Sequence, residues 1–198
     1  PTINAFHSVV SPSIMEFYDF IGVERTVASR PGVEDVALRS LLSVKYLLNH
    51  NNSKDFVDEG GNTRMPDYEY VKTSGNYYVY ENKNYVPYGF SYDYYMSRQF
   101  CETYGKSMRT ELMLKAILLT DSQIEKYGEY MTDIEELSIG ESTQTGGTAM
   151  RFTDVDMAND AAKLRQTSAK EFTVDNNGFT ARVERDKKSL VFFSVPYD

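Results

Sequence analysis

The feature that most constrains the fold is a tyrosine-rich stretch from Asn76 to Tyr95, which holds eight of the 16 tyrosines. The segments YEYVKT and NYYVYEN flank Ser74 and Gly75, a pair that is typical of turns. Aromatic and β-branched residues favour strands, and a short turn between two such runs favours antiparallel pairing. The stretch therefore predicts a β-hairpin. A ligand surface is the alternative use of so many tyrosines, because each side chain offers an apolar ring and a hydroxyl group.

Helices are predicted around this hairpin, because apolar residues recur there at helical spacing. The predicted helices cover residues 12–21, 36–42, 97–105, 107–120, 121–131 and 153–168. Ser107 and Asp121 are the expected N-caps of two of them. Thr153 and Asp156 form a variant of the capping-box pattern at the start of the last helix. The run VKYLL, residues 44–48, is almost continuously apolar and predicts a central strand.

Two polar segments divide the chain. Residues 49–66 contain few apolar residues and predict an exposed loop, the segment expected to be least ordered. The run IGESTQTGGTAM predicts a boundary between a main body, residues 1–145, and a C-terminal lobe, residues 146–198. Residues 170–196 predict three short strands in a meander. The fold class is therefore α+β, with a mixed or antiparallel sheet flanked by helices and a small C-terminal lobe of a helix and a β-meander.

Composition argues against several classes of protein. The formal net charge of -8 disfavours binding to nucleic acids and to anionic lipid surfaces. Cys101 is the single cysteine, and His7 and His50 are the only histidines, so we expect no internal disulfide and no metal site. Apolar runs such as LVFFSV are far shorter than the roughly 20 residues that span a bilayer. We expect no membrane insertion of this chain itself, and no cofactor.

No catalytic residue is predicted. His7 and Ser8 are adjacent, and adjacent side chains of an extended chain point to opposite faces, so they cannot pair as base and nucleophile. Cys101 lies within a predicted helix, where a buried structural thiol is the expected role. A chain with 29 acidic residues contains many acidic pairs by chance, and sequence spacing alone does not identify a glycosidase pair among them.

Four stretches, taken together, resemble one protein family. They are INAFHS near the start, LRSLLSVKYLLN at residues 38–49, ENKNYVPYGFSYD at residues 81–93, and SLVFFSVPYD at the end. Their order and spacing resemble the extracytoplasmic region of YfhO-type bacterial membrane proteins and span nearly the whole chain. The family pattern continues beyond SVPYD into a small β lobe, and the chain begins at Pro1 without an initiator methionine. We therefore expect this sequence to be an excised piece of a longer protein.

The resemblance implies a polytopic, glycosyltransferase-like protein of the C superfamily at the outer face of the bacterial cytoplasmic membrane. Such a protein is thought to move sugars from polyprenyl-linked donors onto envelope glycopolymers such as teichoic acids. The resemblance places the catalytic acid in the transmembrane module of the same parent chain, so this region would be non-catalytic and would have that module as its partner. The resembling stretches supply the candidate residues for contact with a ligand or partner: His7, Ser8, Lys45, Tyr46, Asn84 and Tyr88.

Two alternative functions stay open at this point. A carbohydrate-binding module would display several tyrosine rings together on its surface. A soluble glycoside hydrolase would need a cleft with two facing carboxylates about 5 to 9.5 Å apart. The positions of the tyrosines and of the acids in the folded chain distinguish these alternatives.

Overall fold

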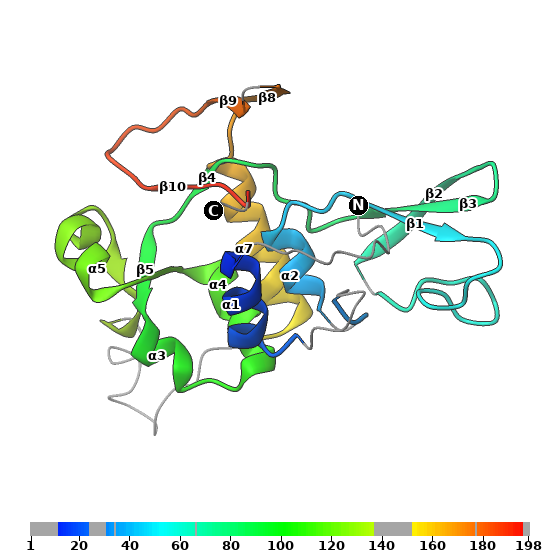
Figure 1. Cartoon of the computed structure of the whole chain (residues 1–198), viewed down its shortest axis with the longest axis horizontal. Coiled ribbons are helices and arrows are strands. Elements are labelled where there is room, and N and C mark those ends of the chain that lie inside the picture. The colour runs from blue at the N-terminus through cyan, green and yellow to red at the C-terminus, as the bar shows by residue number, and fades with distance from the viewer. Residues whose placement is uncertain are drawn as a thin grey trace.

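The structure is a computed structural model that describes residues 12–23, 31–33, 35–65, 67–136, 152–176 and 178–195. Within these segments the chain has an α+β fold, as predicted (Figure 1). Helices gather at the centre, a three-stranded sheet extends to one side of them, and shorter strands lie around the other sides. No helix in the segments described is both long enough and apolar enough to cross a membrane.

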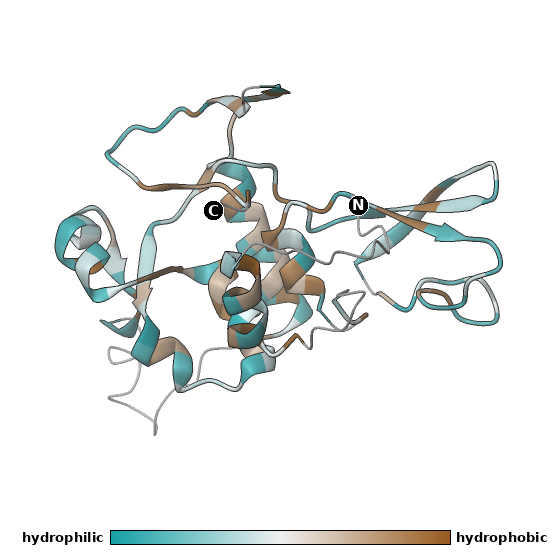
Figure 2. Cartoon of the chain, viewed as in Figure 1, coloured by the Kyte–Doolittle hydropathy of each residue, from teal (hydrophilic) through white to brown (hydrophobic). Residues whose placement is uncertain are grey.

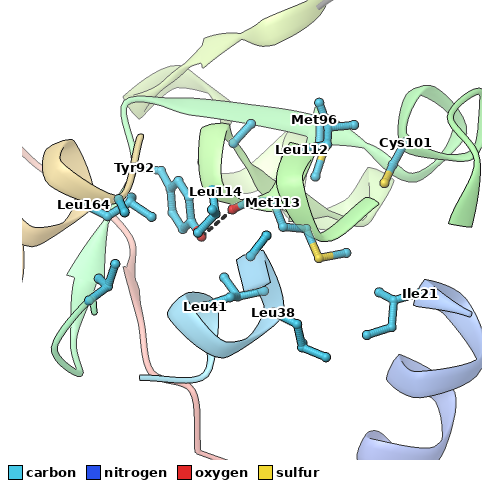
Figure 3. Packing of buried hydrophobic residues seen from close by; sticks show 14 of the residues in the cluster. Ile21, Leu38, Leu41, Tyr92, Met96, Cys101, Leu112, Met113, Leu114 and Leu164 are labelled. Carbon is cyan, nitrogen blue, oxygen red and sulfur yellow. Dashed lines mark hydrogen bonds between the residues drawn. The ribbon is translucent and has the colours of Figure 1, made fainter. Parts of the chain in front are cut away.

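The central helices build the main hydrophobic core. They are α1 (Pro12–Ile21), α2 (Val36–Leu41), α4 (Arg109–Lys115) and α7 (Asp154–Gln166), and α4 lies against both α2 and α7. Their apolar faces meet at buried residues such as Leu38 and Leu112, and Figure 2 shows many of the hydrophobic positions there. The hydroxyl of Tyr92 enters this core and donates a 2.8 Å hydrogen bond to the carbonyl of Met113 (Figure 3). The bond satisfies a polar group whose burial would otherwise be costly.

Local sequence signals explain how several helices begin and end. Gly22 follows α1 with a φ of +79°, a conformation that glycine adopts without steric cost. α3 (Arg98–Glu102) forms within the helix predicted for residues 97–105. α7 begins with the predicted capping box, in which the Thr153 hydroxyl accepts a hydrogen bond from the backbone N–H of Asp156. These predictions succeeded because their signals are local in the chain.

The helix predicted for residues 107–120 is wrong in its second half. A short turn of 3₁₀ helix, η1 (Lys106–Met108), precedes α4, and Ser107 caps neither of them. After Lys115 the chain forms the strand β6 (Ile117–Leu119), which pairs in parallel with β5 (Tyr94–Ser97). A short apolar run suits either a helix or a buried strand, and here the pairing with a distant strand decides between them.

The parallel sheet has the strand order β6-β5-β7, where β7 is Thr132–Asp133. Between β6 and β7 lie α5 (Asp121–Tyr127) and the 3₁₀ turn η2 (Gly128–Tyr130). The N-cap of α5 is Thr120 and not the predicted Asp121, because the Thr120 hydroxyl accepts a hydrogen bond from the backbone of Gln123. The helix prediction for residues 121–131 is confirmed, with a shift of its cap by one residue.

The tyrosine-rich hairpin is confirmed. It consists of β2 (Tyr68–Ser74) and β3 (Tyr77–Asn82), joined by a turn in which Gly75 has a φ of +57°. β1 (Tyr46–His50) pairs antiparallel with β3, so the strand order is β1-β3-β2. The expectation of a central strand at VKYLL is therefore wrong in position, because β1 is an edge strand whose residues alternate between exposed and buried.

One face of this sheet covers a second, smaller core. Leu47 of β1, Tyr68 of β2 and Tyr80 of β3 pack there on residues supplied by the preceding loop. These loop residues are Phe56, Val57 and Met65, and all three are buried. The prediction that residues 49–66 form an exposed loop is thus only partly right. Three apolar side chains in that stretch are enough to fold it against the sheet.

The C-terminal strands differ from the predicted meander. β8 (Glu171–Asp175) and β9 (Gly178–Arg182) form an antiparallel hairpin, but β10 (Val191–Phe192) pairs with β4 (Phe90–Ser91) instead. The aromatic rings of Phe90 and Phe192 lie 5.3 Å apart between centroids, so the pairing also packs a half-buried Phe192 against the fully buried Phe90. The predicted domain boundary at residues 145 and 146 lies outside the part of the chain that the structure describes.

Candidate functional site

The predicted contact residues fall into three places. His7 and Ser8 lie outside the described residues. Lys45 and Tyr46 lie together at the start of β1, on the three-stranded sheet. Asn84 and Tyr88 lie in the segment between β3 and β4, where Asn84 is buried and Tyr88 is half-buried. The structure therefore brings only part of the predicted set together.

Lys45 organises a small polar and aromatic cluster, the Lys45 cluster, consisting of Lys45, Tyr46, Glu81 and Tyr85. Its ammonium Nζ lies 3.6 Å from Glu81 Oε1, and 5.1 and 5.6 Å from the ring centroids of Tyr46 and Tyr85. Interactions with Tyr46, and to a smaller degree with Glu81, raise the pKa of Lys45. The amine thus stays charged and is held between two aromatic faces, which is a favourable arrangement for a cation.

This cluster lies at one end of the sheet face that points away from the second core, which we call the outer face. The register pairs Tyr46 with Glu81, Leu48 with Val79, and His50 with Tyr77, so all six side chains lie on this face. Tyr46, Leu48 and Tyr77 are 44, 56 and 46% exposed. Tyr77 packs edge-on against His50 with 5.2 Å between the ring centroids. The outer face is thus an exposed surface with a tyrosine near each end, about 14 Å apart along the strands.

Three other tyrosines in and near the hairpin serve the cores. Tyr68, Tyr80 and Tyr92 are only 1, 2 and 4% exposed. Tyr70 is 57% exposed, but it pairs with Tyr80 and so belongs to the opposite face of the sheet. The tyrosine-rich stretch therefore has two roles, since some rings fill the cores and others remain on the outer face.

Asn84 lies beside a carboxyl group that the sequence did not single out. Asn84 Nδ2 and Asp67 Oδ2 are both buried, and neither has a hydrogen-bond partner among the described residues. Burial raises the pKa of Asp67, and the negative charge of Asp154 adds to this rise. Asn84 lies close enough to lower the pKa of Asp67 in part, although the contact falls short of hydrogen-bond geometry. No signal in the sequence indicated that Asp154 affects Asp67, because the two residues are far apart along the chain.

Tyr88 belongs to an aromatic stack at the base of the β8–β9 hairpin. Its ring lies parallel to that of Phe172 with 4.7 Å between the centroids, and Phe172 stacks in turn on Phe179 at 5.1 Å. This packing joins the segment after β3 to the C-terminal hairpin. Whether Asn84 and Tyr88 also touch a ligand stays a prediction.

Metal and thiol chemistry find no support in the part of the chain that the structure describes. No group of three or more His, Cys, Asp or Glu side chains there could hold a metal ion. Cys101 is buried, and this burial raises the pKa of its thiol to about 11. A thiol with such a pKa is almost entirely protonated at neutral pH and is a poor nucleophile.

Three of the stretches that carry the family resemblance meet next to the Lys45 cluster. Asn82 Nδ2 donates a hydrogen bond of 3.1 Å to the carbonyl oxygen of Val44, and the Asn82 backbone N–H donates to the carbonyl of Lys45. The Ser43 hydroxyl lies 3.0 Å from that of Ser194, which belongs to the C-terminal stretch. Residues that are distant in the sequence thus form one packed unit that fixes the start of β1.

Comparison with known protein families places the chain among bacterial membrane proteins. The family described as "Bacterial membrane protein YfhO" matches residues 1–148. The chain therefore belongs to the YfhO family, as the four stretches suggested. No curated protein and no solved structure shows significant similarity to the chain.

Proposed function

We propose that this chain is an extracytoplasmic region of a polytopic, glycosyltransferase-like membrane protein that glycosylates cell-envelope polymers. The transmembrane module of the same protein carries out the sugar transfer. This region is non-catalytic, lies at the outer face of the cytoplasmic membrane, and holds a glycan near the membrane. Its ligand is an envelope glycopolymer or a polyprenyl-linked sugar.

The observation that carries this proposal is membership of the YfhO family over residues 1–148, combined with the aromatic outer face within that range. Tyrosine rings stack on the apolar faces of sugar rings, and their hydroxyl groups bond to sugar hydroxyls. Tyr46 and Tyr77 stand on the same face of a rigid sheet, with Leu48 between them. Lys45 adds a cation next to Tyr46, which suits the phosphate groups of a teichoic acid or of a polyprenyl phosphate.

A binding titration tests this role. The chain contains no tryptophan, so its intrinsic fluorescence comes from tyrosine and responds to a ligand that covers exposed rings. Wall teichoic acid is titrated first, and a polyprenyl-phosphate sugar in detergent second. We expect Tyr46→Ala and Tyr77→Ala to weaken binding by about 2- to 10-fold each, as stacking contacts of this kind contribute.

Tyr70→Ala is the matched control, because Tyr70 is 57% exposed and lies on the opposite face of the same sheet. This variant should bind as the unaltered chain does. The proposed glycan contact is wrong if neither ligand binds, or if all three alanine variants lose affinity equally.

A further inference from the structure

The outer edge of the three-stranded sheet at β1 carries free backbone groups. The backbone N–H of Asn82 donates to the carbonyl of Lys45, and that of Asn51 donates to the carbonyl of Asn76. The register between β1 and β3 has no bulge, so residues of β1 point their backbone groups alternately toward β3 and away from it. Since Lys45 and Asn51 bond to the β3 side, Leu47 and Asn49 between them do so as well. Tyr46 and Leu48 therefore direct their N–H and C=O groups away from β3. Within the described residues, none of these four groups has a hydrogen-bond partner.

The opposite edge of the sheet, at β2, is protected in a way that β1 is not. The register of β2 shifts between Tyr70 and Lys72, which indicates a bulge at Val71. The charged residues Glu69 and Lys72 lie on this strand and are exposed. Bulges and charged side chains are the usual means of preventing unwanted strand pairing at an edge. β1 has neither a bulge nor a charged residue between Tyr46 and Leu48, so it is the edge open to a further strand.

We propose that β1 is a self-association edge, at which a second copy of this chain pairs its own β1 antiparallel to the first. The register places Tyr46 opposite Leu48 of the second copy, and by symmetry Leu48 opposite Tyr46 of the second copy. This arrangement makes four backbone hydrogen bonds and uses only groups that are free in one chain. It joins the two sheets into one sheet of six strands with a continuous outer face.

In the proposed register the two strands cross at Leu47. The hydrogen bonds at His50 favour this register over the alternative in which the strands cross at Leu48. The His50 carbonyl already accepts a 2.8 Å hydrogen bond from the Ser53 backbone and a 3.1 Å hydrogen bond from Asn49 Nδ2. If the strands crossed at Leu48, the His50 carbonyl would also have to accept a hydrogen bond from the backbone N–H of Tyr46 in the second copy. Centring the pair on Leu47 leaves it undisturbed.

The charge distribution favours a second copy as the occupant. The whole chain carries a net charge of -8, so two copies repel each other overall. At the start of β1 the charges are balanced, because Lys45 pairs with Glu81 of the neighbouring strand. Two copies can therefore approach along this edge without an excess of like charge. The pairing uses backbone groups at the edge of the sheet and does not require a bound glycan.

The expected association is weak. Two strands of five residues bury less surface than the roughly 1,000 Å² typical of a stable specific interface. Sedimentation equilibrium should therefore detect dimers of the full 198-residue chain only toward high protein concentration. Leu48→Lys should remove this concentration dependence, because it places two charges at the edge. Val71→Lys, on the β2 edge, should behave as the unaltered chain, since Leu48 and Val71 are similarly exposed at 56 and 47%.

Cysteine cross-linking tests the register even when dimers are sparse. Residues that face each other in a hydrogen-bonded antiparallel pair have Cα atoms about 5.5 Å apart, within the range for a disulfide. A mixture of Tyr46→Cys chains and Leu48→Cys chains should therefore form covalent dimers faster than either variant alone. Equivalent residues of the two copies are offset by about 7 Å along the strands, which is too far. Cys101 stays out of the reaction because it is buried.

The control mixture combines Tyr46→Cys chains with Val71→Cys chains. The proposal is overturned if this mixture cross-links as fast as the first one, or if the unaltered chain and the Leu48→Lys variant sediment identically at all concentrations. Faster cross-linking of Leu48→Cys alone would overturn the register.

Discussion

The hydroxyl groups of Ser43 and Ser194 lie 3.0 Å apart, although 151 positions separate the two residues. Ser43 has a φ of +57° and is the one non-glycine residue with a positive φ in the described chain. Its backbone N–H donates to the carbonyl of Ser40, and that of Val44 donates to the carbonyl of Arg39. This pattern ends α2 in a left-handed turn and directs the chain into β1. The serine pair holds the C-terminal segment against that turn.

Substitutions at Ser43 should separate the hydrogen bond from the backbone strain. Ser43→Ala loses the bond and keeps the unfavourable φ, so it should lower the free energy of unfolding by about 1 kcal/mol. Ser43→Gly also loses the bond but relieves about 1 kcal/mol of steric cost, so it should be nearly neutral. Urea denaturation measures both variants. The double variant Ser43→Ala/Ser194→Ala tests whether the bond joins only these two residues. It should lower the free energy of unfolding no more than either single change, and additive losses would contradict the bond.

Two glycines with positive φ should differ sharply in their tolerance of alanine. Gly75 has a φ of +57°, and a Cβ atom there would meet no atom within 4 Å. Gly89 has a φ of +72°, and a Cβ atom there would lie 2.8 Å from Cε1 of Phe193 and 3.1 Å from Cβ of Ala169. Gly75→Ala should cost about 1 kcal/mol from its backbone alone. Gly89→Ala should cost at least about 1 kcal/mol more, from overpacking against Phe193. Equal shifts in thermal unfolding would contradict this account.

The ion pair between Lys115 and Asp160 should matter more than its neighbour. Both side chains are largely buried, with 18 and 10% exposed. Lys163 also approaches Asp160, at 3.5 Å, but its side chain is 75% exposed. Lys115→Ala should therefore cost about 2 to 4 kcal/mol, because it leaves a buried carboxylate poorly compensated. Lys163→Ala should cost less than about 1 kcal/mol. Similar losses for the two variants in denaturant titrations would show that Asp160 is better solvated than the structure indicates.

The carboxyl group of Asp67, which has one buried oxygen, should make stability depend on pH. Its pKa is raised, first by burial and then by Asp154. A group with a raised pKa contributes its share of stability below the ordinary carboxyl pKa of about 4, and that share is lost as the pH rises through the raised value. Asp67→Asn has no titrating group at this position, so it does not lose stability in this way. The melting temperature of the variant should therefore rise relative to that of the unaltered chain as the pH increases from about 4 toward neutrality.

Asp58 provides a control of opposite sign. The side-chain and backbone N–H groups of Asn62 lower the pKa of Asp58 by hydrogen bonding to its carboxylate. Its share of stability is present above the ordinary carboxyl pKa and is lost as the pH falls through the lowered value. Asp58→Asn should therefore destabilise the chain at neutral pH and have less effect in acid. If both variants shift in the same direction at neutral pH, the assignment of Asp67 is wrong.

What the sequence could predict was local. The hairpin around Gly75 and the capping box at Thr153 were both found, because each signal lies within a few residues. The strand at Ile117–Leu119 was missed, because its partner β5 lies in another part of the chain and its apolar run fits two structures. The pairing of β10 with β4 was missed for the same reason.

The sequence supplied only part of the Lys45 cluster. Lys45 and Tyr46 came from the family resemblance, but their partners Glu81 and Tyr85 became visible only when β1 was seen to pair with β3. Strand register decides which side chains share a face, and the sequence alone did not set that register. Asp67 was missed because its raised pKa depends in part on the charge of Asp154, which lies in a distant segment of the chain.

The most direct test of the central claim is the side of the membrane on which this region lies. Glu125 is exposed on α5, so Glu125→Cys in the protein expressed in its native membrane offers a reactive thiol. The buried Cys101 should stay unlabelled in the unaltered protein. We predict that a membrane-impermeant maleimide labels Glu125→Cys in intact cells as fully as in lysed cells. Labelling only after lysis would place this region in the cytoplasm and contradict the proposed function.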